Sequence, residues 1–433
     1  MELRNKKGID IVGLPSNLFF CTKLIDILKE EASSKLLTIT VKTIFGLEDV
    51  LVEELNELGY SKTDRLNRAV QLKGTWRDVY YLNLHLRCAI SILVEVKVFK
   101  IRNEDDLYNQ CMKIDWTKYF SIDKTFAIKG AVFSDMFNHT QYPFFVVKDA
   151  IADTFRNKMN DRPDVNVKAP QVMFDVYINK DVVTISLNTS GAPLFQRGYR
   201  EEIGIAPLNE VVAAGLIRMS GWDRKSTFVD PFCGSGTILI EAALLAANIP
   251  SMMERQHYAF KNFEGFDSEL WESIRAEVNT RLTSLPCEIL GSDISDEMVT
   301  KTRRNLRGLS IGRFVKTEVK PFTEIKELTA PGIMVSNPPY GERMGEEIEE
   351  LYGQIGDWMK TDMKGFDCWL LSSNMDAFKF VGLRPERKIK MYNGDLECSF
   401  RKYSIYEGSK KGKYMNNPES EQGEYSIEQG EEN

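Results

Sequence analysis

Apolar and polar positions follow two different patterns along the chain, which predicts two parts. Up to about residue 190, short apolar runs typical of strands alternate with segments whose apolar residues recur at helical spacing. No group of reactive side chains stands out in this α+β half, so binding is its expected role. The expected strands cover residues 37–42, 69–72, 89–99, 125–132, 171–179 and 182–188, and the expected helices cover residues 46–58, 76–85 and 144–158.

From residue 207 onward, strands and helices alternate strictly, as they do in a doubly wound parallel sheet. Residues 387–392 and 396–406 flank Asn393-Gly394, which is a strong hairpin signal. The fold class predicted here is therefore α/β, with a Rossmann-like sheet that ends in an antiparallel hairpin. Its other expected strands are residues 227–230, 288–293, 332–337 and 366–373, and its expected helices are residues 207–222, 236–248, 296–306 and 346–360.

Composition narrows the class of protein. The chain has 433 residues, of which 43% are hydrophobic and 27% charged, so it can bury the cores of two or three domains. No apolar run approaches the roughly 18 residues of a membrane helix, and the start carries no secretory signal pattern. We expect residues 1–36 to be an extension and residues 408–433 to be a disordered acidic tail, because that tail has almost no apolar content.

Cysteine, histidine and net charge add further expectations. The seven cysteines are scattered without a C-x-x-C pair, and the three histidines are far apart in the sequence. We therefore expect no disulfide framework and no metal site, which fits a reducing cytoplasm. The net charge of −7 does not indicate nucleic acid, so any RNA contact would depend on a local patch.

A glycine-rich motif separates the first strand and the first helix of the sheet just predicted. Glycines let a backbone turn tightly and approach a ligand closely, so the motif predicts a nucleotide loop. It is neither a Walker loop nor a full dinucleotide fingerprint, because the lysine and the third glycine are missing. A plain helix-capping turn is the alternative. The motif reads Asp230-Pro231-Phe232-Cys233-Gly234-Ser235-Gly236-Thr237.

Asp293 ends the second strand, where a carboxylate can accept hydrogen bonds from both hydroxyls of a ribose. It lies 57 residues beyond Gly236, much further than the usual spacing of about 20. An insertion at roughly residues 251–285 would explain this distance. The alternative role for Asp293 is the N-cap of the next helix.

Asn337-Pro338-Pro339-Tyr340 follows the third strand and suits an amine substrate. A nucleobase amine is a poor nucleophile because its lone pair is conjugated into the ring. The side-chain oxygen of Asn337 and the carbonyl of Pro338 can bind both N–H groups, and the prolines fix the backbone. Tyr340 offers a face on which a flipped base can stack. The motif by itself does not distinguish guanine from adenine.

These motifs resemble those of Rossmann-type methyltransferases that use S-adenosylmethionine to methylate amines. Together with residues 37–190, further segments are similar to the THUMP-containing ribosomal RNA large-subunit methyltransferase L family, which methylates guanine N2. The resemblance covers roughly residues 37–406. The segments are residues 195–200 (FQRGYR), 206–210 (APLNE), 263–267 (FEGFD) with 270–271 (LW), and 393–398 (NGDLEC).

The resemblance implies a ferredoxin-like adaptor at residues 37–95, a THUMP RNA-binding domain at 96–195 and a methyltransferase domain at 196–407. It implies that Asn337, Pro338, Pro339 and Tyr340 bind the target base. The residues that it implies for the cofactor are Asn209, Asp230, Pro231, Phe232, Gly234, Gly236, Thr237, Asp293, Ile294 and Asn337. An acidic residue for the adenine amine is not assigned, since residues 316–322 offer only Glu318 in an uncertain register.

Basic residues with interleaved aromatics predict where RNA binds. Arg197 and Arg200, with Phe195 beside them, could contact phosphates and stack on bases, or they could fix a linker. Lys129 belongs to a basic cluster in the expected THUMP domain. This cluster could bind RNA, and an ordinary solvated surface is an equal alternative.

The function that the resemblance implies is methyl transfer from S-adenosylmethionine to guanine N2 in 23S rRNA. The same chemistry on tRNA, adenine-N6 methylation of a nucleic acid, and a non-catalytic RNA-binding role are the alternatives. The THUMP-like half argues against DNA, and the intact motifs argue against a decayed enzyme.

Overall fold

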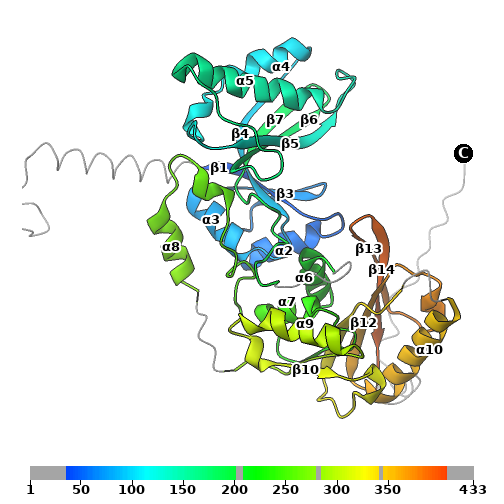
Figure 1. Cartoon of the computed structure of the whole chain (residues 1–433). Coiled ribbons are helices and arrows are strands. Elements are labelled where there is room, and N and C mark those ends of the chain that lie inside the picture. The colour runs from blue at the N-terminus through cyan, green and yellow to red at the C-terminus, as the bar shows by residue number, and fades with distance from the viewer. Residues whose placement is uncertain (1–35, 201–207, 279–283, 341–344, 407–433) are drawn as a thin grey trace, which may run out of the picture. The chain divides into compact units, whose positions relative to one another are not determined.

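The computed structural model describes residues 36–200, 208–278, 284–340 and 345–406 (Figure 1). The predicted tail, and the predicted extension apart from residue 36, lie outside these ranges. The chain forms two compact units. The first unit contains the chain up to Thr43, Leu51–Leu194 and Gln256–Glu277, and the second contains Ile44–Val50, Phe195–Arg255 and the chain from Val278 onward.

A seven-stranded sheet in the order β2-β3-β1-β4-β7-β6-β5 is the frame of the first unit. In Figure 1 helices α4 and α5 lie together over β5, β6 and β7. The strands are β1 (Leu37–Lys42), β2 (Thr63–Leu66), β3 (Ala69–Gly74), β4 (Ser91–Lys100), β5 (Phe126–Phe133), β6 (Val172–Asn179) and β7 (Val182–Asn188). The helices before residue 195 are α2 (Glu48–Glu57), α3 (Trp76–His85), α4 (Glu104–Cys111), η1 (Trp116–Lys118) and α5 (Tyr142–Met159).

Strand β4 joins the two modules expected in this half. Its first residues pair with β1, and from Leu93 to Lys100 it pairs with β7, with an irregularity between Glu95 and Lys97. The boundary expected at residues 95 and 96 falls inside this strand. The two modules therefore share one continuous sheet.

The insertion expected at residues 251–285 supplies part of the first unit. Residues 256–277 hold η2 (Ala259–Asn262) and α8 (Ser268–Ala276). The amide of Phe260 donates to the carbonyl of Thr189 at 3.0 Å, and the amide of Glu264 donates to the carbonyl of Tyr119 at 3.0 Å. Trp271 is 1% exposed and packs with its ring 5.1 Å from that of Phe260. These residues fall within the methyltransferase domain expected at residues 196–407, whereas they pack in the first unit.

The second unit is built on a seven-stranded sheet in the order β10-β9-β8-β11-β12-β14-β13. Strands β8 to β12 run parallel, and β14 is antiparallel to both β12 and β13. The predicted Rossmann-like sheet with an antiparallel terminal hairpin is thus confirmed. The strands are β8 (Thr227–Asp230), β9 (Ile289–Asp293), β10 (Val315–Val319), β11 (Gly332–Ser336), β12 (Phe366–Ser372), β13 (Arg387–Asn393) and β14 (Leu396–Ser404).

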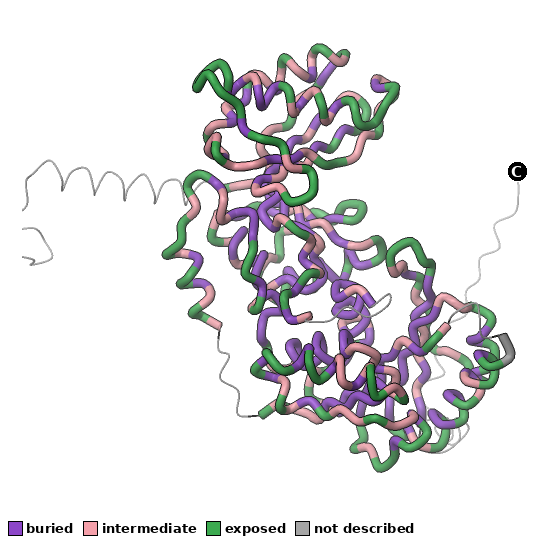
Figure 2. The backbone as a smooth tube through the Cα atoms, viewed as in Figure 1, coloured by how far each residue is buried: buried purple, intermediate pink, exposed green. Residues whose placement is uncertain are grey.

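Helices cover both faces of this sheet, as the alternation of strands and helices predicted. They are α6 (Glu210–Met219), α7 (Thr237–Ala246), α9 (Asp296–Arg307) and α10 (Gly345–Asp362). Successive strand residues point to opposite faces. Phe228 accordingly lies in the core under α6 and α7, while Val229 lies in the core that contains Tyr352 and Ile355 of α10. Buried positions run through the centre of the sheet (Figure 2).

Substituting Trp271 tests whether the insertion helps to hold the first unit together. Trp271→Ala removes a fully buried aromatic side chain, so it should lower the free energy of unfolding by about 3–5 kcal/mol. Urea denaturation of the full chain measures this. Glu272→Ala on the exposed face of the same helix is the matched control and should cost less than about 0.5 kcal/mol. Equal effects of the two substitutions would contradict the assignment.

Candidate functional site

The sheet of the second unit brings the three chemical motifs to one edge. Strands β9, β8 and β11 are neighbours and run parallel, so their carboxyl ends lie together. Those ends carry Asp293, Asp230 and the Ser336–Asn337 step. Ligands of open parallel sheets bind at this edge.

Asp230 is a buried carboxyl group at the centre of this edge. It is 1% exposed, and its Oδ1 accepts a hydrogen bond from the hydroxyl of Ser336 at 2.5 Å. The amide of Phe232 donates to the same oxygen at 3.2 Å. Burial raises the pKa of Asp230 to about 7, against these two hydrogen bonds, and the charge of nearby Asp293 adds to the rise. Burial disfavours the charged form of Asp230, and a cationic ligand next to it would favour that form.

The glycine-rich loop takes a shape that needs its glycines. Gly234 and Gly236 have φ of +53° and +85°, a region that favours glycine. A Cβ on Gly236 would also lie 2.6 Å from Cγ2 of Thr302. Thr302 donates its hydroxyl to the carbonyl of Gly234 at 2.7 Å, and the side chain of Asn305 donates to the carbonyl of Ser235 at 3.0 Å. Helix α9 thus holds the loop in place.

Asp293 fastens the loop from the other side. Its Oδ2 accepts from the amide of Gly234 at 3.0 Å, and its Oδ1 accepts from the amide of Ser295 at 2.9 Å. Ser295, and not Asp293, is the N-cap of α9, so the alternative role considered for Asp293 is wrong. Each carboxylate oxygen keeps further acceptor capacity. The neighbouring Ile294 is 77% exposed and forms an open apolar surface beside it.

The amine motif offers a hydrogen-bond acceptor that is not in use. Oδ1 of Asn337 is buried and accepts no hydrogen bond from the described residues. Pro338 is buried and Pro339 is exposed. An unsatisfied buried acceptor costs about 1–3 kcal/mol, and an incoming N–H group would remove that cost.

Tyr340 is half-buried beside Asn337. Burial raises its pKa, and Cys398 adds to the rise, whereas hydrogen bonds from the side chains of Asn393 and Asn337 act in the opposite direction. Asn393 belongs to the hairpin β13–β14, so this hairpin reaches the amine motif. Tyr340 therefore lies near residues of the terminal hairpin.

Asn209 caps α6, and Arg200 connects the start of this helix to the loop. Asn209 is the N-cap of α6 and accepts from the amide of Val211 at 2.8 Å. Arg200 donates to Glu210 at 2.9 Å, to the hydroxyl of Ser235 at 3.2 Å and to the hydroxyl of Thr237 at 3.0 Å. Its side chain is 13% exposed. Its hydrogen bonds are directed to the glycine-rich loop, which differs from the RNA contact predicted for it.

Arg197 is not the RNA contact that the sequence pattern suggested. Its side chain is fully buried, and its Nε lies 3.1 Å from Oε1 of Glu241. The hydroxyl of Tyr199 donates to the same oxygen at 3.2 Å. A guanidinium without exposed surface cannot reach a phosphate, so this prediction is wrong. The missed signal was Glu241 itself, since a buried acid in the apolar helix α7 requires a partner.

The other two predicted RNA contacts stay predictions. Lys129 is exposed on β5, and Phe195 is half-buried.

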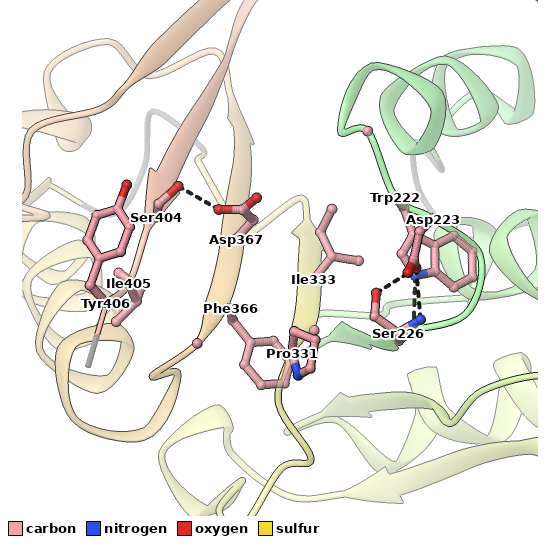
Figure 3. Close-up of a pocket in the computed structure, with 13 residues that line it drawn as sticks. Trp222, Asp223, Ser226, Pro331, Ile333, Phe366, Asp367, Ser404, Ile405 and Tyr406 are labelled. Atoms are coloured by element: carbon pink, nitrogen blue, oxygen red, sulfur yellow. Dashed lines mark hydrogen bonds between the residues drawn. The ribbon is translucent and has the colours of Figure 1, made fainter. Parts of the chain in front are cut away.

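A separate cavity of about 360 Å³ lies at the opposite edge of the same sheet. It is lined by Gly332 and Phe366, the first residues of β11 and β12, and by Ser404, the last residue of β14 (Figure 3). The motifs described above leave from the other ends of β11 and β12. This cavity is therefore not part of the candidate site.

Within the described ranges, no three His, Cys, Asp or Glu side chains are arranged to hold a metal ion. No helix in these ranges is long and apolar enough to span a membrane.

Three domain families match the chain in order. Residues 38–93 match the RlmL ferredoxin-like domain, residues 101–188 the THUMP domain, and residues 197–402 the RMKL-like methyltransferase domain. The chain thus combines the RlmL ferredoxin-like and THUMP domains with an RMKL-like methyltransferase domain.

The curated relatives that the chain matches are named as ribosomal RNA methyltransferases. The chain is 34% identical over 381 residues to the ribosomal RNA large subunit methyltransferase K/L of Psychromonas ingrahamii, covering 86% of this chain and 50% of that protein. It is 35% identical to the protein of the same name from Shewanella sp. (strain W3-18-1), covering 84% and 52%. The chain thus spans about half the length of the curated relatives it matches.

Solved structures named as a methyltransferase or a methylase match over nearly their whole length. One was crystallised with S-adenosylhomocysteine; it is 27% identical with a TM-score of 0.77, covering 87% of this chain and 100% of that one. Another, from Listeria monocytogenes str. 4b F2365, is named for N6-adenine-specific DNA methylation. It is 26% identical with a TM-score of 0.77, covering 87% and 98%.

The raised pKa of Asp230 predicts a pH dependence of stability. Between about pH 4 and pH 7 the folded state binds more protons than the unfolded chain, so the free energy of unfolding falls as pH rises through this window. Asp230→Asn removes this slope. Its stability relative to the wild type should therefore increase by about 2–3 kcal/mol between pH 5 and pH 8 in urea titrations.

Asp223→Asn is a control of opposite sign. Hydrogen bonds from the amides of Ser226 and Lys225 lower the pKa of Asp223, so its charge stabilises the fold above pH 4. This variant should lose stability at pH 8. A stability difference between Asp230→Asn and the wild type that stays constant with pH would refute the role given to burial.

Proposed function

We propose that this chain transfers the methyl group of S-adenosylmethionine to the exocyclic N2 amine of a guanine in 23S ribosomal RNA, in the cytoplasm. The observation that carries the proposal is the unused buried acceptor Oδ1 of Asn337, one residue after Ser336, whose hydroxyl binds Asp230. Oδ1 of Asn337, which can bind an amine, is thereby held next to the carboxyl group of Asp230, which suits a cationic ligand. The family and the names of its curated relatives support the choice of reaction and of RNA.

The residues at the loop fit this cofactor. When bound, it supplies an activated methyl group on a sulfonium, so the protein has to bind, orient and exclude water. Asp293 keeps acceptor capacity for ribose hydroxyls, and exposed Ile294 offers an apolar surface for adenine. Asp230 would stabilise positive charge, and Arg200 provides a cation at the methionine end of the loop. Pro231, Phe232, Gly234, Gly236 and Thr237 complete the loop as backbone and packing contacts.

The amine motif does the remaining work on the substrate. Oδ1 of Asn337 and the carbonyl of Pro338 would accept the two N–H groups and favour a pyramidal nitrogen. Pro339 fixes the backbone after them, and Tyr340 offers its ring to the flipped base. After transfer the methylated amine is acidic, so its proton can pass to water without a dedicated base.

Labelled methyl transfer tests this function. The full chain is incubated with methyl-labelled S-adenosylmethionine and total RNA from cells that lack the gene, and the labelled RNA and nucleoside are identified. We expect N2-methylguanosine in 23S rRNA. Label in tRNA or in N6-methyladenosine would show that the proposed substrate is wrong. The absence of label from all RNA would show that the chain does not methylate RNA.

Asn337→Ala tests the residue that carries the proposal. It should reduce transfer by about 100-fold or more while leaving the affinity for S-adenosylhomocysteine within about twofold, because the glycine-rich loop, Asp230 and Asp293 stay unchanged. Asn374→Ala is the matched control, since Asn374 follows the neighbouring strand β12 and accepts a hydrogen bond from the amide of Ala377, the first residue of η5 (Ala377–Lys379). The control should keep its activity. Retained turnover in Asn337→Ala would remove the assigned role.

Arg200 can be tested without turnover. Arg200→Met should weaken S-adenosylhomocysteine binding by about 10- to 100-fold but leave 5′-methylthioadenosine binding unchanged, because that ligand lacks the amino-acid carboxylate. Calorimetry with both ligands measures the ratio. Glu210→Gln removes the ion pair but keeps the guanidinium, so it should preserve the preference for S-adenosylhomocysteine. An equal loss for both ligands in Arg200→Met would show that the arginine only shapes the loop.

A further inference from the structure

Phe45 and Tyr392 form an aromatic pair in the second unit that the site described above does not use. Their ring centroids are 5.9 Å apart and their planes are inclined by 71°. Phe45 is 48% exposed, and Tyr392 is half-buried. An edge-to-face contact of this kind leaves a face of the exposed ring free to take another flat group.

The backbone around Phe45 is firmly anchored. Leu47 is 0% exposed and packs so closely on α6 that a Cβ on Gly215 would lie 2.6 Å from its Cδ2. The amide of Leu47 donates to the carbonyl of Ile44 at 3.0 Å, and Gly46 turns the chain with φ of +89°. The exposed ring thus lies on a turn that is fixed by buried neighbours. Little conformational entropy would therefore be lost when the ring binds a ligand.

Sheet topology places this pair at the edge that carries the amine motif. Strand β12 is parallel to β11, and β13 runs in the same direction because both β12 and β13 are antiparallel to β14. The end of β13, with Tyr392 and Asn393, therefore lies at the carboxyl edge, where Asn337 follows β11. Asn393 also lowers the pKa of Tyr340, so the end of β13 is near the amine motif.

We propose that Phe45, supported by Tyr392, is a stacking platform for an unpaired nucleobase of the substrate RNA next to the flipped target. Flipping one base exposes the faces of its neighbours, and an aromatic ring at the rim of the site can cover one of them. This inference rests on the proposed function.

The platform would act through stacking and not through charge. Lys390 is the cation beside Tyr392, 5.6 Å from the ring centroid, and it is paired with Glu397 at 2.7 Å. Phosphate contacts depend steeply on salt, whereas stacking on an aromatic ring does not involve counterion release. The contribution of Phe45 to RNA affinity should therefore be the same at low and at moderate salt.

Steady-state kinetics on 23S rRNA with the full chain test the platform. Phe45→Leu keeps an apolar side chain but removes the aromatic face, so KM for RNA should rise about 5- to 100-fold. Phe45→Tyr should remain within about twofold of the wild type. The affinity for S-adenosylhomocysteine should not change in either variant, and the ratio of the KM values should be the same at 50 mM and 150 mM salt, about the range over which phosphate contacts weaken strongly.

Phe314→Ala is the matched control. Phe314 is a partly exposed aromatic residue with Arg313 over its ring, and it directly precedes β10, at the opposite edge of the sheet. It should leave KM for RNA unchanged. Wild-type turnover combined with an unchanged KM in Phe45→Leu would overturn the platform alone, whereas failure of the wild type to methylate any RNA would overturn the proposed function. An equal rise of KM in Phe45→Leu and Phe45→Tyr would also overturn stacking.

Discussion

One hydrogen bond ties the two halves of the site together. The hydroxyl of Ser336 at the end of β11 donates to the carboxyl group of Asp230 at the end of β8, and both residues are buried. These strands are neighbours in the middle of the sheet, so the spacing between the glycine-rich loop and the amine motif is set by the interstrand distance of the β-ladder. Methyl transfer requires such precision, because misplacement by about 1 Å can cost about 100-fold in rate.

The rest of the second unit holds this pair of strand ends steady. Thr302 and Asn305 bind carbonyls of the loop from α9, while Asp293 binds the amide of Gly234. These contacts satisfy backbone groups that would otherwise be left to water or ligand. The side chain of Asn337 is treated differently, since its buried oxygen has no partner among the described residues. The site thus combines a loop held by side-chain hydrogen bonds with one buried acceptor, Oδ1 of Asn337, that is available to a ligand.

Sequence patterns could predict the sheet and its motif positions because they depend on local rules. Strand β8 is a buried apolar run and Asn393-Gly394 is a turn signal, and neither needs knowledge of distant residues. The edge strand β10 was missed, since its sequence is half polar and only pairing with β9 makes it a strand. Arg197 was misassigned for the same reason. Whether a guanidinium faces RNA or a buried Glu241 depends on long-range packing, which spacing alone does not reveal.

The path of the chain between the two units has a consequence for how such an enzyme can evolve. Residues 44–50 belong to the second unit although they lie among residues of the first, and residues 256–277 do the reverse. Neither unit is therefore a contiguous segment that recombination could exchange as one piece. A chimera cut near residue 195 would separate Leu47 from its packing on α6 and Trp271 from Tyr80. Recombination at that junction would break both cores at once, so the two units are expected to be inherited together.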